Sequence, residues 1–517
     1  MTFPSRIYRI WNEKPLILIL GLAVFFRLLS VIFAKGWGML DDHFLVIESA
    51  QSWVDGFDYN SWLPWTKENH GPTGHNFFYP GLNFLLFSFF RFIHLEDPQT
   101  KMFFVRLITA AWSLLTVYLG YSITERISNR KSARMVGLLL AVFWFMPWLS
   151  VRNLIEIVCI PFLMLSIWVM IRQEKKATLG MVLLAGLFLG LAINTRLQTA
   201  FFAIGLGLAL LLLGKWKETI VLTVGTLIPV FLIQGLIGYF LWHDPFAELF
   251  EHIRCNLATA NDYFVLPWYT YLLFMTGILI PPVSLFILAG FVFSWKRYLL
   301  IFMPVAVFIL FHSLFPNKQE RFILPVVPLL IVTGISGWND FVTRSGYWQK
   351  HRKLMNGCWT FFWILNLFLL SVVSVVYSKR AKVETMTYLS KYPDIKQILV
   401  ADQNDSPDIF PLFYLGQWVH PYEDLLECKN TGELILKAAR APYDEHPRFI
   451  LFLGEKDLQN RVIKARASFP FLVYETTVLP GFIDNIMHFL NPVNKNKKVF
   501  IYRNAEFFKT KPKVCLE

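Results

Sequence analysis

The chain has 517 residues, of which 55% are hydrophobic and 17% aromatic, while only 16% carry a charge. A soluble protein carries roughly a quarter charged residues, so this composition excludes an ordinary soluble protein. The net charge of +13 would suit nucleic acid, but the basic residues gather in short loops between apolar runs, as in a polytopic membrane protein. We therefore expect no nucleic-acid partner. The five cysteines show no paired or metal-ligand spacing, which argues against a structural metal site.

Apolar runs long enough to cross a hydrocarbon core of ~30 Å recur from Pro15 to Tyr377. Placing every basic loop on the cytoplasmic side predicts about 11 transmembrane helices. The stretch Phe77–Phe92 is also apolar, but counting it as a span would move the basic loop around Arg126 outside, so we expect an interfacial helix there. The expected spans are 15–34, 102–124, 133–150, 154–171, 179–194, 197–213, 219–241, 271–294, 298–315, 322–337 and 357–378.

The composition changes after Ser378, where charged residues become common and the apolar runs shorten to strand length. These runs alternate with helix-like stretches such as Glu433–Ala441, a pattern typical of a small α/β domain. The predicted fold class is therefore a polytopic α-helical membrane protein with a C-terminal soluble α/β domain. The transmembrane domain spans 1–378 and includes a first outward loop at 36–101, and the outward-facing soluble domain spans 379–517. The expected strands are Gln397–Ala401, Arg448–Leu453, Phe471–Tyr474 and Lys498–Tyr502.

Two adjacent carboxylates, Asp41 and Asp42, follow the first expected span in the run Gly-Trp-Gly-Met-Leu-Asp-Asp-His-Phe. One carboxylate would suffice to cap the helix that begins there. The second indicates an acid or base that works on a polar substrate at the membrane surface. His43 follows directly, and Glu48 either shares the same helix face or is solvated.

A basic turn on the outer side, Phe-Pro-Asn-Lys-Gln-Glu-Arg-Phe, ends at Phe322. Lys318 and Arg321 flank Glu320 there, against the usual enrichment of basic residues on the cytoplasmic side. Two interpretations stay open: the long stems reach along the membrane interface, or the cations clamp a phosphate, whose oxygens match the planar fork of arginine.

Further polar and aromatic residues fall on the same outer side. Polar groups beside aromatic planes suit a sugar ring, although aromatic residues at this depth also form interface belts. Ionisable residues close to spans tend to be functional, which favours a shared site. These residues are Arg152, Asn153, Glu156, Arg196, Trp268 and Tyr269.

Together these motifs resemble a known family. They are Asp41-Asp-His-Phe44 with Glu48, Asn153-Leu-Ile-Glu156, Pro267-Trp-Tyr269, Asn317-Lys-Gln-Glu-Arg-Phe-Ile-Leu-Pro325 and, near the C-terminus, Val499-Phe-Ile-Tyr-Arg503. The chain resembles the polytopic GT-C glycosyltransferases, and within them the family 22 α-mannosyltransferases that build GPI anchors and N-glycan precursors. It departs from the family pattern at Asp42, where Glu is usual, and at Asn317 and Gln319, which replace His and Glu. These departures leave the sugar and the acceptor open.

The resemblance implies an inverting transfer of a sugar, with mannose expected, from a polyprenyl- or dolichyl-phosphate donor to a lipid-linked or surface glycan acceptor. Asp41 would be the general base and Asp42 would help to orient the acceptor. Lys318 and Arg321 would bind the donor phosphate. The remaining outer residues, together with His43, Glu48 and Glu320, are candidates for substrate binding. No cofactor is implied, and the need for a divalent metal stays open.

The expected location is a bacterial inner membrane with a periplasmic active site, and the ER membrane is the alternative. The main alternative function is a polytopic transporter or flippase of lipid-linked glycans. A transporter would place ionisable residues deep in its spans, often in two related halves. Gln234 and Asn366 are nearly the only strongly polar residues at such depth here, so chemistry at the membrane surface is favoured.

Overall fold

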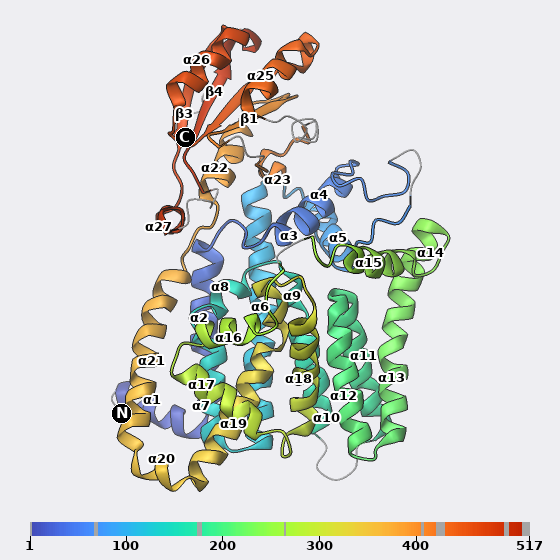
Figure 1. Cartoon of the computed structure of the whole chain (residues 1–517), viewed down its shortest axis with the longest axis vertical. Helices are drawn as coiled ribbons and strands as arrows, with labels where there is room; N and C mark the ends of the chain where they lie inside the picture. The colour runs from blue at the N-terminus through green and yellow to red at the C-terminus, as the bar shows by residue number, and fades with distance from the viewer. Residues whose placement is uncertain are drawn as a thin grey trace. The chain divides into compact units, whose positions relative to one another are not determined.

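The computed structural model describes residues 3–66, 71–172, 178–262, 265–404, 408–419, 430–490 and 496–508. The chain divides into two compact units, each of which is drawn in Figure 1. The helical unit comprises Met1–Ala34, Ser61–Leu82 and Phe103–Val375, and the α/β unit comprises Lys35–Asn60, Asn83–Met102 and Val376–Glu517. Two segments that the sequence analysis assigned to the first outward loop thus group with the C-terminal part, while the predicted boundary at 378 stays a prediction.

The helical unit is built from helices of very different length, with η marking short 3-10 or π turns. Helices α5 (Phe78–Phe92) and α6 (Pro98–Ile127) each begin in one unit and end in the other. The remaining elements are α1 (Phe3–Glu13), α2 (Pro15–Phe33), α7 (Arg130–Val142), α8 (Met146–Ser150), α9 (Ile155–Val158), α10 (Ile160–Ile171), α11 (Leu179–Thr195), η2 (Leu197–Thr199), α12 (Ala200–Leu212), α13 (Trp216–Val230), η3 (Phe231–Gly235), α14 (Leu236–Trp242), α15 (Ala247–Ala258), α16 (Thr270–Ile278), α17 (Val283–Phe293), α18 (Leu299–Leu314), η4 (Glu320–Val326), α19 (Val327–Arg344), α20 (Gly346–Lys350) and α21 (Arg352–Val373).

Within the described residues, five helical stretches are long and apolar enough to cross a membrane. They are Pro15–Phe33, Pro98–Ile127, Trp216–Trp242, Glu320–Arg344 and Arg352–Val373. Shorter apolar helices of 10–17 residues cover Ile155–Ile171, Leu179–Thr195, Leu197–Leu212, Val283–Phe293 and Leu299–Leu314. The predicted helix in the region Phe77–Phe92 is present as α5, whereas its interfacial location and the total of about 11 spans stay predictions.

Two of the expected spans are not continuous helices. The stretch predicted at 133–150 consists of α7 and α8, and the stretch predicted at 271–294 consists of α16 and α17. Phe143 has an extended backbone, and Pro147 lies in the first turn of α8, the helix that follows. Between α16 and α17 lie Pro281 and Pro282, which donate no backbone N–H and disfavour helix in the residue before them. A count of apolar residues does not register these breaks.

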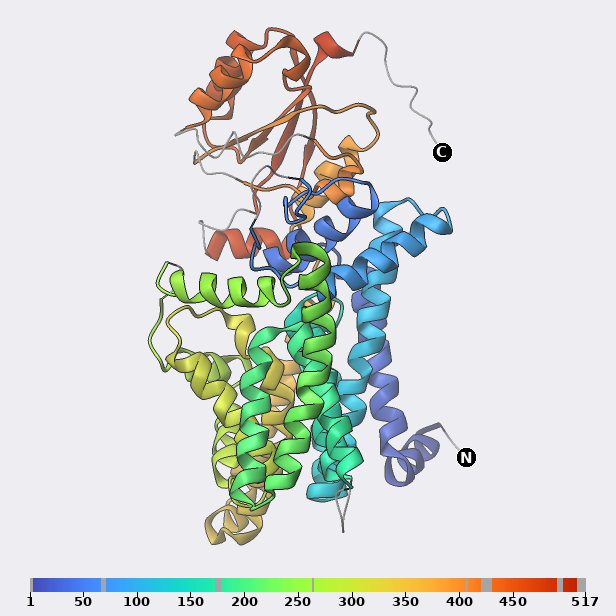
Figure 2. The same ribbon diagram turned by 90° about the vertical axis from the view of Figure 1, so that its right-hand side faces the viewer.

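Close helix packing in this unit depends on small residues. Helices α11 and α13 pack together, as do α17 and α19 (Figures 1 and 2). A Cβ added to Gly290 of α17 would lie only 2.0 Å from the carbonyl oxygen of Gly334 of α19. Since lipid supplies no hydrophobic drive between helices, this backbone approach contributes van der Waals contact that larger side chains would prevent.

The α/β unit contains one four-stranded sheet in the order β1-β2-β4-β3, with β1 and β2 parallel and the other pairs antiparallel. The four expected strands are present, and β3 continues to Val478, beyond its predicted end at Tyr474. The elements are α3 (Leu40–His43), η1 (Phe44–Glu48), α4 (Ser49–Val54), α22 (Arg380–Leu389), β1 (Ile398–Asp402), α23 (Leu412–Leu415), α25 (Thr431–Arg440), η5 (Tyr443–Glu445), β2 (Phe449–Leu453), α26 (Leu458–Ser468), β3 (Leu472–Val478), α27 (Phe482–Leu490), β4 (Val499–Asn504) and η6 (Ala505–Phe507).

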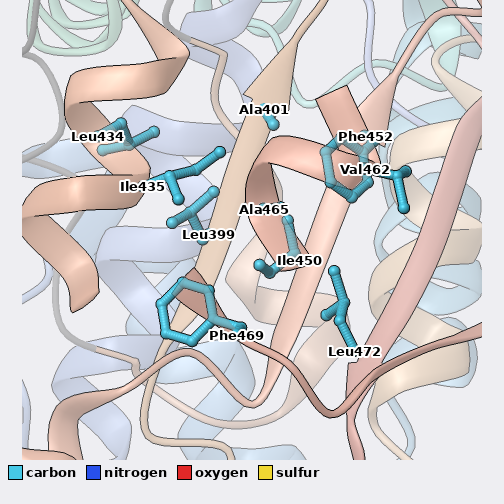
Figure 3. Packing of buried hydrophobic residues seen from close by; sticks show 10 residues of the cluster. All are labelled: Leu399, Ala401, Leu434, Ile435, Ile450, Phe452, Val462, Ala465, Phe469 and Leu472. Atoms are coloured by element: carbon cyan, nitrogen blue, oxygen red, sulfur yellow. The ribbon is translucent and has the colours of Figure 1, made fainter. Parts of the chain in front are cut away.

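A compact apolar core joins α25 and α26 to this sheet (Figure 3). Leu434 and Ile435 of α25 and Val462 and Ala465 of α26 pack with side chains of the first three strands in sequence. The parallel strands β1 and β2 are buried at every position. This pattern is expected for parallel strands that are covered on both faces.

Candidate functional site

The basic turn and two other polar motifs of the helical unit meet at one buried carboxylate, Glu156. Its Oε1 atom accepts a short hydrogen bond from Nη1 of Arg196 and lies 3.6 Å from Nε of Arg321. Glu156 belongs to α9, Arg196 caps the C-terminus of α11 with an extended backbone, and Arg321 lies in η4. The three residues are buried, with exposed fractions of 1%, 3% and 7%. The structure thus brings together three candidates that lie far apart in the sequence, and we call them the arginine cluster.

Phe322 supports both cations of this cluster. The guanidinium groups of Arg196 and Arg321 lie 5.0 and 5.4 Å from the centre of its ring. A cation over an aromatic face is stabilised by the ring quadrupole, and more so away from water. Sequence reasoning assigned no role to Phe322, although its position directly after Arg321 in the turn was a usable signal.

The arginine cluster carries two cations and one anion, so it has an excess of positive charge. The Nε and Nη2 atoms of Arg196 are buried and make no hydrogen bond to any other part of the described chain. These two atoms form one edge of the guanidinium fork, which matches two oxygens of a phosphate or carboxylate. A buried donor without a partner costs free energy. The open edge of Arg196 is therefore suited to an anionic ligand.

His312 lies at the end of α18 and also has an unused polar atom. Its Nδ1 atom is 2.9 Å from the carbonyl oxygen of Phe308. Because a carbonyl only accepts, Nδ1 carries the proton, and Nε2 of the neutral ring is an acceptor. Nε2 is buried and makes no hydrogen bond within the described ranges. His312 was not among the predicted site residues.

Lys318 lies in the same turn as Arg321 and is buried, with Nζ donating to the carbonyl oxygen of Phe315. Burial lowers the pKa of Lys318, because removing the ammonium group from water disfavours its charged form. An anion in this turn would favour the charged form. The geometry is therefore compatible with the predicted role in phosphate binding, which stays a prediction.

Arg152 and Asn153 lie shortly before Glu156 in the sequence and make contacts of their own. Oδ1 of Asn153 accepts a short hydrogen bond from the hydroxyl group of Tyr79, at the start of α5. The guanidinium of Arg152 lies 4.4 Å from the ring of Trp148. Asn153 therefore fixes the segment around Tyr79, a contact that sequence reasoning missed because no spacing links the two residues.

Three other candidates of the helical unit are exposed. Trp268 and Tyr269 have exposed fractions of 67% and 44%, and their rings meet edge to face at 5.8 Å. Glu320 is exposed, and its carboxylate makes no ion pair within the part of the chain that the structure describes. None of the three joins the buried cluster. Their predicted role in substrate binding would have to be exerted from the surface.

In the α/β unit the two adjacent aspartates have different environments. Asp42 is buried, with an exposed fraction of 4%, and its Oδ2 atom accepts a hydrogen bond from the backbone N–H of Gly38 at 2.9 Å. Asp41 is only partly buried. Of the pair, Asp41 is thus the more exposed residue, and Asp42 holds the preceding loop.

His43 and Glu48 meet because the helix between them is not α-helical. The segment Phe44–Glu48 forms a π turn, in which residues five apart lie one turn above each other. The Nε2 atom of His43 lies 3.3 Å from Oε1 of Glu48, a contact of ion-pair length without hydrogen-bond geometry. In a regular α-helix the same pair would point to different sides. The sequence analysis expected Glu48 on a shared face or in solvent, and the structure buries it fully.

Partners from distant segments enclose His43 and Glu48. The imidazole of His43 stacks between Trp37 and Tyr414, with ring centres 5.2 and 5.5 Å away. Oε1 of Glu48 accepts a hydrogen bond from the backbone N–H of Phe413 at 3.1 Å. Glu48 and His43 therefore fix α23 beside the segment that carries Asp41. Nothing in the sequence around Tyr414 pointed to this contact.

The described residues contain no group of three or more His, Cys, Asp or Glu side chains placed to hold a metal ion. The two sets of polar residues instead include a partly exposed aspartate, Asp41, in the α/β unit and a buried arginine fork, Arg196, in the helical unit. Such groups serve proton transfer and anion binding respectively.

Solved structures share this architecture. ArnT from Cupriavidus metallidurans bound to undecaprenyl phosphate matches with a TM-score of 0.58 at 14% identity, over 96% of this chain and 99% of ArnT. The apo structure of the same protein matches with a TM-score of 0.54 at 12% identity, again over 96% and 99% of the two chains. The archaeal oligosaccharyltransferase AglB from Archaeoglobus fulgidus, in complex with an inhibitory peptide and a dolichol-phosphate, has a TM-score of 0.47 at 11% identity, over 97% of this chain and 75% of AglB. The likeness to ArnT establishes the fold, which is that of the GT-C glycosyltransferases.

The sequence defines the family. The model of the Alg9-like mannosyltransferase family matches residues 18–418, and the chain belongs to this family. It is a multi-pass membrane glycosyltransferase, which confirms the enzyme class and the family resemblance expected from the motifs. A comparison with curated protein sequences finds no significant match.

Proposed function

We propose that the enzyme transfers mannose from a polyprenyl- or dolichyl-phosphate donor to a hydroxyl group of a lipid-linked or surface glycan. The arginine cluster is the observation that carries this proposal, because its open guanidinium edge fits the phosphate of such a donor. The binding of undecaprenyl phosphate by ArnT, which has the same fold, supports a donor of this chemistry. We place the reaction on the outward face, with a bacterial periplasm favoured over an ER lumen.

In the proposed reaction the carboxylate of Asp41 takes the proton of the acceptor hydroxyl group. The acceptor oxygen then attacks the anomeric carbon, the bond from that carbon to the phosphate oxygen breaks, and the lipid phosphate leaves with the electron pair. The anomeric configuration is inverted. Asp41 is partly exposed, as a base that meets a substrate from outside has to be. Asp42 supports it by fixing the loop at Gly38.

The charge of the lipid phosphate grows as the sugar bond breaks. Arg196 and Arg321 are held in place before the reaction by Glu156 and Phe322. Fixed donors aimed at a developing charge stabilise the transition state without reorganisation. Lys318 adds a cation to the same turn. This electrostatic role needs no cofactor, and we propose that none is required.

A transfer assay with a panel of sugar donors tests the proposal. The full chain is reconstituted in lipid vesicles and supplied with different polyprenyl-phosphate sugars and extracted lipid acceptors. We expect transfer with the mannosyl donor and loss of transfer in Asp41→Asn, with folding and insertion unchanged. Asp444→Asn makes the same chemical change at an exposed position of the α/β unit and should leave activity intact. Full activity of Asp41→Asn would rule out its role as the base, and transfer of another sugar alone would overturn the donor.

A further inference from the structure

Helix α27 of the α/β unit presents an apolar face to the outside. Phe482 and Phe489 have exposed fractions of 78% and 85%, and Ile486 and Met487 have 38% and 46%. Residues 482, 486 and 489 recur at helical spacing and share one side of the helix. Bulky apolar groups are seldom grouped in water without a partner, and such groups mark an interaction site.

The other side of α27 is fixed to the chain by a buried carboxylate. Asp484 accepts hydrogen bonds from the backbone N–H groups of Lys379 and Arg380 at 3.4 and 3.2 Å, and from the side chain of Asn496 at 3.0 Å. Within the α/β unit the helix lies away from the four-stranded sheet, as both views show (Figures 1 and 2). Helix α27 is therefore anchored to the start of α22, and the apolar face of α27 does not pack against the sheet.

This anchor follows a membrane-crossing helix at short distance along the chain. Helix α21 is one of the five candidate spans, and only 17% of its apolar window is buried inside the protein. Its last residue is Val373, six residues before Lys379. Six residues reach at most about 20 Å when extended. The point to which α27 is bonded thus lies within reach of the bilayer surface.

We propose that α27 lies in the membrane interface, with Phe482, Ile486 and Phe489 inserted among the lipids. An amphipathic helix that places aromatic and aliphatic groups on one face binds the boundary between head groups and acyl chains in this way. Arg380, which is exposed beside the anchor, suits anionic head groups. The proposal depends on the membrane insertion of α21 and not on the chemistry of sugar transfer.

Site-directed spin labelling of the full chain tests this placement. Cys255, Cys358, Cys428 and Cys515 are replaced by Ser, while Cys159 is fully buried and shielded from the label. One variant carries Phe489→Cys. The matched control carries Ile463→Cys, an aliphatic residue of α26 in the same unit with an exposed fraction of 63%. Both are reconstituted in vesicles of equal parts phosphatidylcholine and phosphatidylglycerol.

The measurement compares collisions of each label with oxygen, which concentrates in lipid, and with a nickel chelate, which stays in water. We expect oxygen collisions to exceed nickel collisions at residue 489 and the reverse at residue 463. Equal access of nickel to both labels would overturn the proposal, because α27 would then face water. Protection of residue 489 from both reagents would also overturn it, because a protein surface would then cover the helix.

Discussion

Arg196 and Glu156 form a buried ion pair that uses only one side of the arginine. The Nη1 atom of Arg196 donates to Oε1 of Glu156, while Nε and Nη2 have no hydrogen-bond partner among the described residues. Taking two charges out of water costs more than such a partial contact returns, so this pair is a poor device for stability alone. Its geometry instead orients the free edge of the guanidinium. Glu156 is, in this interpretation, a positioning residue for the phosphate-binding arginines.

Replacing Glu156 by Gln should therefore separate positioning from folding. We expect the KM for the polyprenyl-phosphate donor to rise about tenfold or more while the KM for the acceptor changes little, because one charged hydrogen bond is worth about 1.5–3 kcal/mol. Initial rates with each substrate varied in turn check this. Glu251→Gln is the control, because it breaks a Glu–Arg pair outside the arginine cluster, with Arg254, whose side chain is exposed. A proportional rise in both KM values would contradict the positioning role.

The substitution Arg196→Lys tests whether the fork itself matters. Lysine keeps the positive charge but presents a point charge instead of two parallel donors. We expect kcat/KM for the donor to fall about 10–100-fold, which corresponds to the loss of one charge-assisted hydrogen bond. Thermal unfolding in detergent serves as the check on folding. If Arg196→Lys retains full activity, the open edge of Arg196 does not bind the phosphate.

The sequence carried the parts of the structure that depend on composition and short motifs. Apolar runs located most of the helices, and alternating short runs located the four strands of the α/β unit. Family motifs singled out Glu156 and Arg321, and its expected place on the outer side singled out Arg196, but no sequence pattern states that the two arginines share the carboxylate of Glu156. Their meeting depends on how α9, α11 and η4 pack.

The misses have local physical causes. Breaks at Phe143 and Pro281 interrupt runs that remain apolar, so hydropathy alone joins the pieces. The π turn before Glu48 shifts the helical face by one residue, which changes the neighbour of His43. Tyr79 and Tyr414 act through contacts across long stretches of chain, and such contacts leave no periodic trace.

Lys318 should show opposite effects on stability and on binding. Burial lowers its pKa. For a lysine with a lowered folded-state pKa, the stabilising effect is present above the unfolded value of 10.5 and is lost as the pH falls through the folded value. At neutral pH the charge therefore costs stability when no anion is bound. We expect Lys318→Met to raise the Tm without donor and to weaken use of the donor.

Differential scanning fluorimetry at neutral pH and donor titration measure the two effects. Lys217→Met, at an exposed position of α13, is the matched control and should change neither. A lower Tm in Lys318→Met would show that the ammonium group is stabilised in the free enzyme. An unchanged donor dependence would remove Lys318 from the phosphate site.

Glu248 of α15 accepts four hydrogen bonds, three from the segment before α5 and one from Trp242 at the end of α14. Its Oε1 atom accepts from the backbone N–H of Thr73 at 3.2 Å and from Nε1 of Trp242 at 2.7 Å. Its Oε2 atom accepts from the backbone N–H groups of Gly74 and His75 at 2.6 and 3.1 Å. Burial raises the pKa of Glu248, and the four donors offset part of that rise.

Glu248→Gln keeps the shape but turns one acceptor into an NH2 group that faces two donors. We expect a loss of about 1–3 kcal/mol, because buried donors are left without a partner. Since the folded pKa is raised, the carboxyl group stabilises the fold most below its unfolded value of 4.5, and this effect is lost as the pH rises through the folded value. The Tm difference between the wild type and Glu248→Gln should therefore be largest in acid and shrink toward neutral pH. Thermal unfolding across that pH range checks this. A Tm difference that grows with pH would contradict the prediction, because the folded state would then favour the carboxylate form of Glu248.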